Sequence, residues 1–264
     1  MEEQEAMFIF VVQFFYMPAI QLSAISTRAP KGVNKEKIKL KTEKIIEELD
    51  ELQNLLIAQS KYSLLVIIQG MDASGKDGVI KNVFGSLNPM GISVKPYKAP
   101  TAEELSHDFL WRIHKQAPEK GMIKLFNRSH YEDVLVTRVH GWCDDELAQK
   151  RMKAINDFEL LLTEHNNTKI LKFYLHISFE EQQERLKERM HDPRKMWKHN
   201  ENDFAEGKLW NKYMGYYNQC FNKCNAVPWI IVPSDQNWYK ENIISQKVYD
   251  TLKSLDMQYP GIKK

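Results

Sequence analysis

The chain has 264 residues, with 37 Lys and Arg against 35 Asp and Glu, so its net charge is only +2. Hydrophobic residues make up 43% of the sequence and charged residues 27%, which is ordinary for a globular protein and excludes a disordered chain, a collagen-like chain and a multi-span membrane protein. A charge near zero argues against a general nucleic-acid coat, so we expect no DNA or RNA partner, and any anion site must come from local clustering.

The N-terminus carries an apolar run at residues 7–16, MFIFVVQFFY. It is too short to span a bilayer, and the glutamates before it are unlike the positive start of a secretory signal. The sequence leaves three interpretations open: an interface arm, a buried strand, or an early start codon with Met17 as the true initiator. We expect residues 1–34 to form an arm that is disordered or has a misassigned start, and no membrane contact. Cys143, Cys220 and Cys224 form no CxxC pair, which favours inert thiols and a reducing, cytoplasmic setting.

Strands and helices alternate after this arm. Apolar residues spaced three to four apart between Ile38 and Leu56 predict a first helix. The other expected elements are strands at 64–69, 92–97, 122–127, 170–178 and 229–232, and helices at 79–86, 102–115, 145–165, 180–190, 203–223 and 239–255. Strands separated by long helices indicate right-handed crossovers and a parallel sheet that is covered on both faces. We therefore predict an α/β fold with a mainly parallel five-stranded sheet, in a single domain at residues 35–264.

The segment Gly70–Lys76 (GMDASGK) fits the phosphate-loop pattern G-x-x-x-x-G-K, between an apolar strand and a helix as the pattern requires. Glycines let the backbone wrap an anion, and successive N–H groups and the helix N-terminus point toward it. Lysine adds a charge for the phosphates between which the bond breaks. The residues expected to bind phosphate here are Gly70, Ala73, Ser74, Gly75, Lys76, Asp77 and Gly78.

Two acidic residues depart from the usual loop. Asp77 stands where a metal-binding Ser or Thr is common, and Asp72 lies inside the loop itself. Carboxylates beside bound phosphates need a neutralising cation, and Mg²⁺ is the natural choice for oxygen ligands and phosphates. The sequence therefore predicts Mg²⁺ held partly by Asp72, with Asp77 as a second ligand or, alternatively, as a helix N-terminal residue favoured by the dipole.

A second polar cluster follows the third expected strand. Asn127 ends that strand, Arg128 comes next, and Glu132 and Asp133 open the following helical segment. An arginine at the carboxyl end of a strand in an open α/β sheet faces the ligand crevice, and its planar guanidinium suits phosphate. The alternative is a helix-capping motif with a surface ion pair.

The loop GMDASGKDG (residues 70–78) and the segment FNRSHYEDVLVTRVH (residues 126–140) together resemble the polyphosphate kinase 2 family. The NRSHYEDVL form is most similar to the branch that acts on both nucleoside mono- and diphosphates. The resemblance implies a P-loop three-layer α/β/α sandwich, thymidylate-kinase-like, with a helical basic lid at about residues 180–210. It also implies phosphoryl transfer between inorganic polyphosphate and AMP or ADP, or their guanine equivalents, and assembly as a homo-oligomer, either a dimer or a tetramer.

The resemblance also assigns residues. It makes Asp72, Lys76, Arg128, Glu132 and Arg151 the catalytic set, with Glu132 either at a second metal or orienting the nucleotide. In the expected lid, Arg185 and Arg189 are four residues apart and share a helix face, and they would bind polyphosphate together with Lys198. A solvated helix face with Glu–Lys pairs is the alternative. Gly207 stands where relatives usually carry an arginine, with Lys208 beside it.

Two other functions compete with this prediction. The chain is alternatively an ATP-using nucleotide kinase, although Asp77 in place of the hydroxyl residue and the basic lid argue against it. It is alternatively a non-catalytic sensor of polyphosphate or nucleotide, although Lys76, Asp72 and Arg128 are all present. We expect structural or orienting roles for His130 and His140, because an acceptor phosphate is already ionised and needs no covalent relay.

Overall fold

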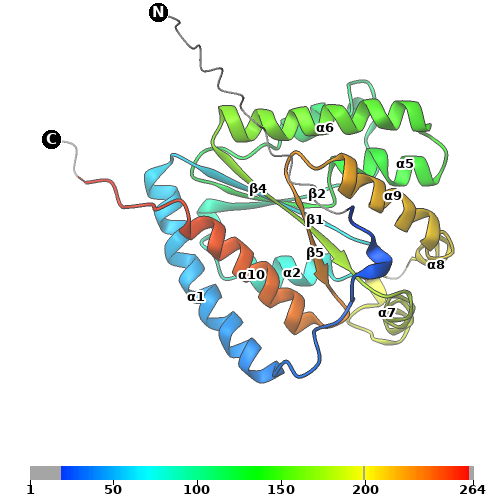
Figure 1. Cartoon of the computed structure of the whole chain (residues 1–264), viewed down its shortest axis with the longest axis horizontal. Helices are drawn as coiled ribbons and strands as arrows, with labels where there is room; N and C mark the ends of the chain where they lie inside the picture. The colour runs from blue at the N-terminus through cyan, green and yellow to red at the C-terminus, as the bar shows by residue number, and fades with distance from the viewer. Residues whose placement is uncertain (1–18, 199, 262–264) are drawn as a thin grey trace, which may run out of the picture.

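The fold is built on one five-stranded sheet in the computed structural model, which describes residues 19–198 and 200–261. The apolar run at residues 7–16 lies outside them. All strand pairs are parallel, in the order β2-β3-β1-β4-β5 (Figure 1). The strands are β1 (Ser63–Gln69), β2 (Ile92–Pro96), β3 (Ile123–Asn127), β4 (Thr168–His176) and β5 (Trp229–Pro233). The predicted fold class and sheet are confirmed, and each strand lies within two residues of its expected place.

Helices cover both faces of the sheet. The central strand β1 shows why, since all seven of its residues are buried and successive side chains point to opposite sides. Leu64, Val66 and Ile68 pack with α1 (Lys35–Gln59), α2 (Lys76–Phe84) and α10 (Asn237–Lys253). Leu65 and Ile67 pack with the other core, which includes α6 (Asp145–His165) and α9 (Trp210–Lys223) (Figure 1). The result is a three-layer sandwich.

Two expected helices are interrupted. The helix predicted at 102–115 is wrong as one element, because α3 (Ala102–Leu105) and α4 (Trp111–His114) are separate. Thr101 caps α3 through a capping box. The Asp108 side chain accepts a hydrogen bond from the Leu110 backbone N–H (2.9 Å), just before α4 begins. Side chains that bond the nearby backbone in this way compete with a continuous helix.

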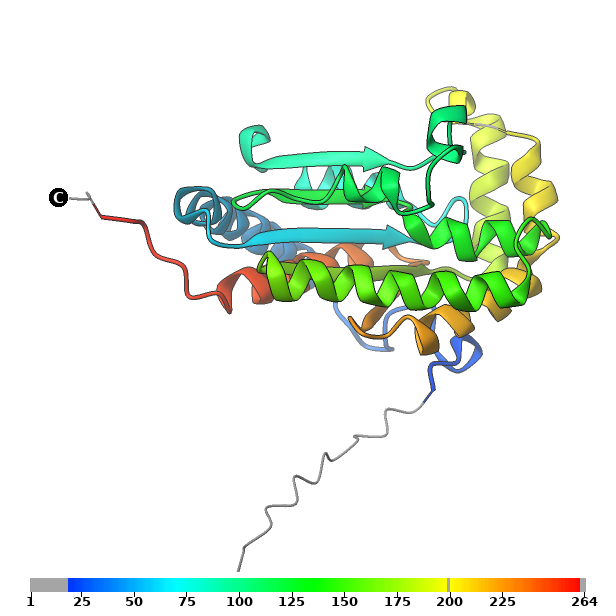
Figure 2. The ribbon, with the colours of Figure 1, turned by 90° about the horizontal axis from the view of Figure 1, so that it is seen from above.

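The helix predicted at 203–223 also divides, into α8 (Asn202–Gly207) and α9. Gly207 is buried where α8 meets α7 (Phe179–His191), and a Cβ at Gly207 would lie 2.9 Å from the Gln183 amide nitrogen. The glycine in the place of the relatives' arginine therefore sits in a close helix contact, while Lys208 beside it is exposed. Figure 2 shows α7 and α8 side by side at the end of the sheet to which the strands point.

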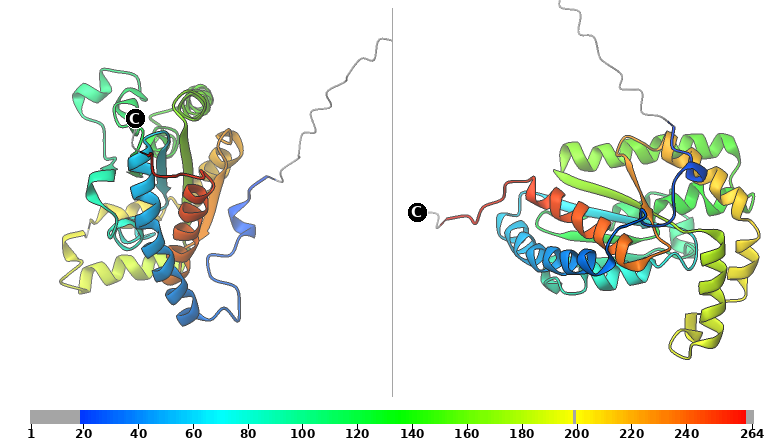
Figure 3. Two further views of the ribbon diagram at one scale, coloured as in Figure 1. Left: turned by 90° about the vertical axis from the view of Figure 1, so that its left-hand side faces the viewer. Right: turned by 60° about the horizontal axis from the view of Figure 1, so that its bottom comes forward.

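Residues 19–33 form an N-terminal strap that crosses from α9 to the loop after β5. The backbone N–H of Ile20 donates to Asn222 (2.8 Å), and the Thr27 hydroxyl donates to the Asp235 carboxylate (2.8 Å). Leu22 is buried in the core on the α9 side of the sheet. Figure 3 shows the strap running between α9 and the start of α1. This part of the expected arm is therefore packed on the domain.

Five shorter helical elements complete the described part of the chain. They are the 3₁₀ turns η1 (Leu22–Ala24), η2 (Pro89–Gly91), η3 (His130–Val134) and η4 (Met196–Lys198), and the single-turn helix α5 (Val136–Val139) follows η3. Within the described parts of the chain, no helix is both long and apolar enough to cross a membrane.

Candidate active site

The phosphate loop joins β1 to α2. Gly70 and Gly75 have positive φ angles of 155° and 94°, and each lies where a Cβ would collide with a neighbour. At Gly70 that Cβ would be 2.7 Å from the Ser74 hydroxyl, and at Gly75 it would be 2.3 Å from the Lys240 ammonium. The glycines are therefore required by the turn and by the close approach of other groups, as the loop motif predicts.

Lys76 folds back over this loop. Its ammonium donates to the carbonyl oxygens of Gly70 (2.7 Å) and Met71 (3.1 Å), and the side chain is buried. Burial, together with the nearby Arg128 guanidinium, lowers the pKa of Lys76 to about 8. This ammonium has lost its hydration, and its hydrogen-bond partners are neutral carbonyl groups. A phosphate bound at the loop would therefore strongly stabilise its charged form.

Arg128 connects the loop to the turn after β3. Its guanidinium donates to Asp72 (2.5 Å) and to Glu132 (3.3 Å). Burial alone would raise the pKa of Asp72, but Arg128, Lys76 and Arg189 lower it below its usual value, so Asp72 is a carboxylate at neutral pH. The fold thus brings together Asp72, Lys76, Arg128 and Glu132, four of the five residues that the sequence selected as catalytic.

Arg151 lies apart from this group. From α6 its guanidinium donates to the backbone oxygen of Asp133 (2.8 Å) and stacks over the Phe109 ring. Among the described residues, no hydrogen bond or ion pair joins Arg151 to Asp72, Lys76 or Arg128. It touches the turn that carries Glu132, and its role at the transferring phosphate stays a prediction.

Asp77 is in the first turn of α2, where the dipole favours a carboxylate, but it has specific partners as well. It accepts hydrogen bonds from the Asn127 amide (2.9 Å) and from the ammonium of Lys198 (2.6 Å). Although partial burial opposes it, these two hydrogen bonds lower the pKa of Asp77. Asp77 therefore links the end of β3 and the η4 turn within the lid segment (residues 179–207) to the phosphate loop.

The lid is the segment of residues 179–207, which contains α7, η4 and α8. Arg185 holds α7 against the phosphate loop by donating to the carbonyl oxygens of Ala73 (3.2 Å) and Ser74 (3.3 Å). Its second terminal nitrogen donates to the carbonyl oxygens of Ser234 and Asp235 in the loop after β5. Arg189, one turn further, donates to Asp203 of α8 (2.8 Å). The two arginines expected to bind phosphate thus also hold the lid in place.

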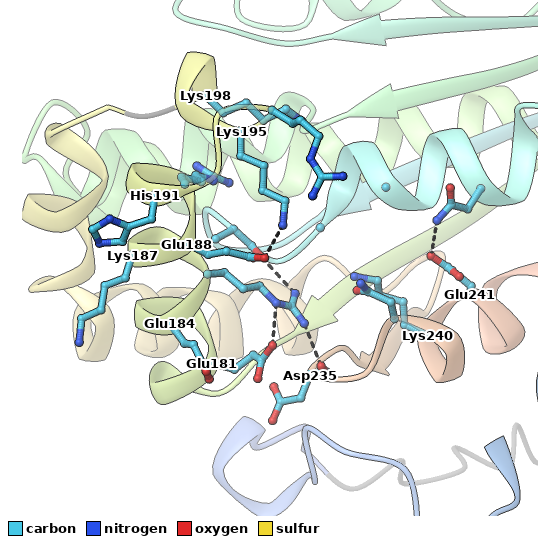
Figure 4. Close-up of a pocket in the computed structure, with 18 residues that line it drawn as sticks. Glu181, Glu184, Lys187, Glu188, His191, Lys195, Lys198, Asp235, Lys240 and Glu241 are labelled. Carbon is cyan, nitrogen blue, oxygen red and sulfur yellow. Dashed lines mark hydrogen bonds and ion pairs between the residues drawn. The ribbon is translucent and has the colours of Figure 1, made fainter.

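A cavity of about 1130 Å³ opens between the lid, the phosphate loop and α10 (Figure 4). Ala73, Gly75 and Gly78 of the loop region line its floor. Acidic groups are present as well, including Glu184 and Glu188. Its cationic lining residues are Arg185, Lys187, Arg189, Arg194, Lys195, Lys198 and Lys240. A cavity lined by seven lysine and arginine side chains is suited to binding a polyanion.

A smaller recess lies against the same loop. Its lining includes Gly70, Met71 and Asp72 from the loop, Arg128 and Glu132 from the turn after β3, and Glu206, Tyr213 and Tyr217 from the lid and α9. Because Gly70–Asp72 line the recess whereas Ala73 and Gly75 line the cavity, the phosphate loop separates the two spaces.

Lys240 was missed by the sequence analysis. It lies on α10, is 1% exposed, and donates to the backbone oxygen of Ser74 (3.0 Å). Burial, with the Arg185 guanidinium nearby, lowers the pKa of Lys240 to about 7. A signal was present: Lys240 precedes Ile244 by four residues and Val248 by eight, so the sequence places a lysine on the apolar face of the last helix.

Asp72 and Asp77 are the residues available for a metal. The described part of the chain contains no group of three or more His, Cys, Asp or Glu side chains that could hold an ion by itself. Mg²⁺ does not require one, since it commonly binds through one or two carboxylates, waters and the substrate's phosphates. The ionised Asp72 at the loop fits that mode.

This parallel sheet, with a glycine-rich loop after its central strand and arginines beside it, defines a P-loop phosphotransferase. The chain belongs to the polyphosphate kinase 2 family, whose family model matches residues 32–260. The resemblance seen in the sequence is confirmed.

Named relatives agree with this membership. The chain is 44% identical over 214 residues to an AMP/ADP-polyphosphate phosphotransferase of Meiothermus ruber, covering 80% of each chain. It is 41% identical over 229 residues to an ADP-polyphosphate phosphotransferase of Rhodopseudomonas palustris, covering 81% of this chain and 79% of the relative. A crystal structure of polyphosphate kinase 2 from Arthrobacter aurescens TC1 superposes with a TM-score of 0.90 at 40% identity, covering 94% of this chain and 90% of that one.

Proposed function

We propose that this protein transfers phosphoryl groups between inorganic polyphosphate and nucleoside mono- and diphosphates, with Mg²⁺, in the nucleotide-phosphorylating direction. One observation carries the proposal: the phosphate loop lies between a large cation-lined cavity and a recess that contains Arg128 and Glu132. The cation-rich cavity suits the polymer. The recess places Arg128 beside the loop, where it would meet the nucleotide's terminal phosphate, with Mg²⁺ offsetting the carboxylates of Asp72, Glu132 and Glu206. The names of the relatives support these two substrate classes.

The chain's own groups explain the transfer. Lys76 and the loop amides hold the phosphates that flank the transferring group, and Arg128 reaches its equatorial oxygens from the other side. The acceptor's terminal phosphate is already ionised at neutral pH, so it attacks in line without a general base. Glu132 orients Arg128 through their ion pair. Mg²⁺, held by Asp72 with Asp77 as a second ligand, would neutralise charge between the phosphates.

The direct test is to mix the protein with polyphosphate, AMP and Mg²⁺ and to measure ADP and ATP by chromatography. We expect both products, and we expect no turnover when EDTA removes the metal. A parallel reaction with ATP as the donor to AMP distinguishes a nucleotide kinase, because that enzyme would be faster with ATP than with polyphosphate. A sensor would bind polyphosphate but release no product in either reaction. Native mass measurement would test the expected dimer or tetramer.

A further inference from the structure

A charged network is buried beneath the turn after β3. The ammonium of Lys172, on β4, donates to Glu159 of α6 (2.7 Å), to the Tyr131 hydroxyl (2.7 Å) and to the backbone oxygen of Cys224 (3.0 Å). The Tyr131 hydroxyl in turn donates to Glu159 (2.8 Å). Lys172, Glu159 and Tyr131 are all 0% exposed. No part of the proposed reaction uses this network.

Burying the charges of this network costs free energy of folding. Burial opposes the charge on both partners, and it lowers the pKa of Lys172, while for Glu159 the attraction of Lys172 prevails and its pKa is lowered as well. Buried ion pairs often stabilise a protein no better than apolar side chains of the same volume. Stabilisation of the fold therefore does not by itself explain an ion pair at this place, and a second role would depend on the groups that it contacts.

The turn that it touches needs support. Arg128 has a φ angle of 62°, in the left-handed region that a residue with a long side chain rarely adopts. Such strain persists where the surroundings fix it. The Gln69 amide donates to the Ser129 hydroxyl (3.0 Å), and Glu159 lies 3.5 Å from the His130 ring nitrogen. The side chains of residues 129–131 are thus anchored in the core.

Arg128 and Glu132 flank the anchored residues on either side. Their side chains point the other way, into the recess beside the phosphate loop. Lys172 also holds the backbone oxygen of Cys224, at the end of α9, whose Tyr213 and Tyr217 line the same recess. The Lys172 ammonium therefore bonds both to the turn after β3 and to the end of α9, the two elements that carry Arg128 and Tyr217 of the recess.

We propose that Lys172, Glu159 and Tyr131 are positioning residues that fix Arg128 and Glu132 for phosphoryl transfer. The proposal rests on the proposed function for its kinetic consequence, but the anchoring itself is a property of the turn. The proposal predicts an effect on kcat rather than on KM. In the described part of the chain, the network makes no direct hydrogen bond to the loop or the lid, which are proposed to hold the substrates' phosphates.

The test uses the full chain and a triple variant with Tyr131→Phe, Glu159→Met and Lys172→Met, which replaces the network by apolar groups of similar size. We expect it to fold, with a melting temperature within about 5 °C of the wild type. Its kcat with polyphosphate and ADP should fall at least tenfold, while KM for polyphosphate changes less than threefold. Hydrogen–deuterium exchange in peptides that cover residues 128–135 should become at least tenfold faster.

The matched control is Tyr174→Phe, because the Tyr174 side chain is buried and, among the described residues, its hydroxyl has a hydrogen bond only to the Met214 sulfur, at 3.7 Å. It should change neither kcat nor exchange at residues 128–135. If the triple variant does not fold, Tyr131→Phe alone replaces it, with the same expected changes. A folded variant with wild-type kcat and wild-type exchange overturns the proposal. If the wild type makes no ATP, the proposed function fails, and the exchange measurement alone then decides the anchoring.

Discussion

Arg128 is the residue at which the acidic groups of the site converge, because one guanidinium contacts both Asp72 and Glu132. Lysine would keep the charge but reach only one of these carboxylates and would lose the planar fork that matches phosphate. We predict that Arg128→Lys lowers kcat at least about 100-fold, on the scale of a lost transition-state contact. Arg28→Lys, at an exposed arginine of the strap, is the control and should keep kcat within twofold. Steady-state kinetics with polyphosphate and ADP check this, and a normal rate for Arg128→Lys would remove it from the catalytic set.

Lys76 and Lys240 should make anion binding depend on pH. Their pKa values of about 8 and about 7 lie below the 10.5 of an unfolded lysine, so the free folded protein binds fewer protons than the unfolded chain between pH 7 and 10.5. Stability without anions should therefore rise with pH through this range. A bound phosphate favours both ammonium forms, so we predict uptake of about one proton when tripolyphosphate binds at pH 8. Calorimetry in buffers of different ionisation enthalpy measures it, and Lys240→Met should reduce it. Equal heats in all buffers would contradict the prediction.

The sequence identified residues whose role depends on local spacing. Gly70, Gly75 and Lys76 follow from one strand–loop–helix motif, so they needed no knowledge of the tertiary fold. Lys240 reaches the carbonyl of Ser74 across 166 positions of the chain. Periodicity places this lysine on the apolar face of the last helix but does not say which group it contacts. The left-handed conformation of Arg128 was likewise hidden, because its support comes from side chains on other elements.

The lid should make donor binding sensitive to salt. The other lysines and arginines of the lid that line the cavity each form an ion pair with an acidic side chain. Among the described residues Lys187 forms none, and it lines the cavity while being exposed. By analogy with single-stranded polyelectrolytes, removing one such cation should lower the slope of log KM for polyphosphate against log salt by about 0.7. We predict this change for Lys187→Gln. Lys150→Gln, at an exposed lysine of α6 paired with Glu146, should leave the slope unchanged. Equal slopes in both variants would mean that the polymer does not follow the lid.

Elements were predicted where burial alone determines them. β1 is apolar on both faces, β4 is buried over most of its length and α6 carries one long apolar stripe, so their bounds came close to the observed ones. The breaks after Leu105 and at Lys208 were missed for a different reason. A polar side chain that bonds its own backbone, as Asp108 does, ends a helix without changing the apolar pattern. The contact of Gly207 with Gln183 depends on how two helices pack, which periodicity does not contain.

The strap ties the start of the described chain to the lid, because Asp235 accepts from Thr27 of the strap and also from the Ser178 backbone N–H that begins α7. We predict that a chain starting at Val33 melts about 5–10 °C below one starting at Met17, since it loses about 2 kcal/mol of hydrogen bonds and the burial of Leu22. Its KM for polyphosphate should rise about threefold or more, because α7 loses support at its first turn. Thermal unfolding and kinetics on the two chains measure both effects, with the full-length protein as the reference. Equal melting temperatures and equal KM values would show that the strap supports neither the domain nor the lid.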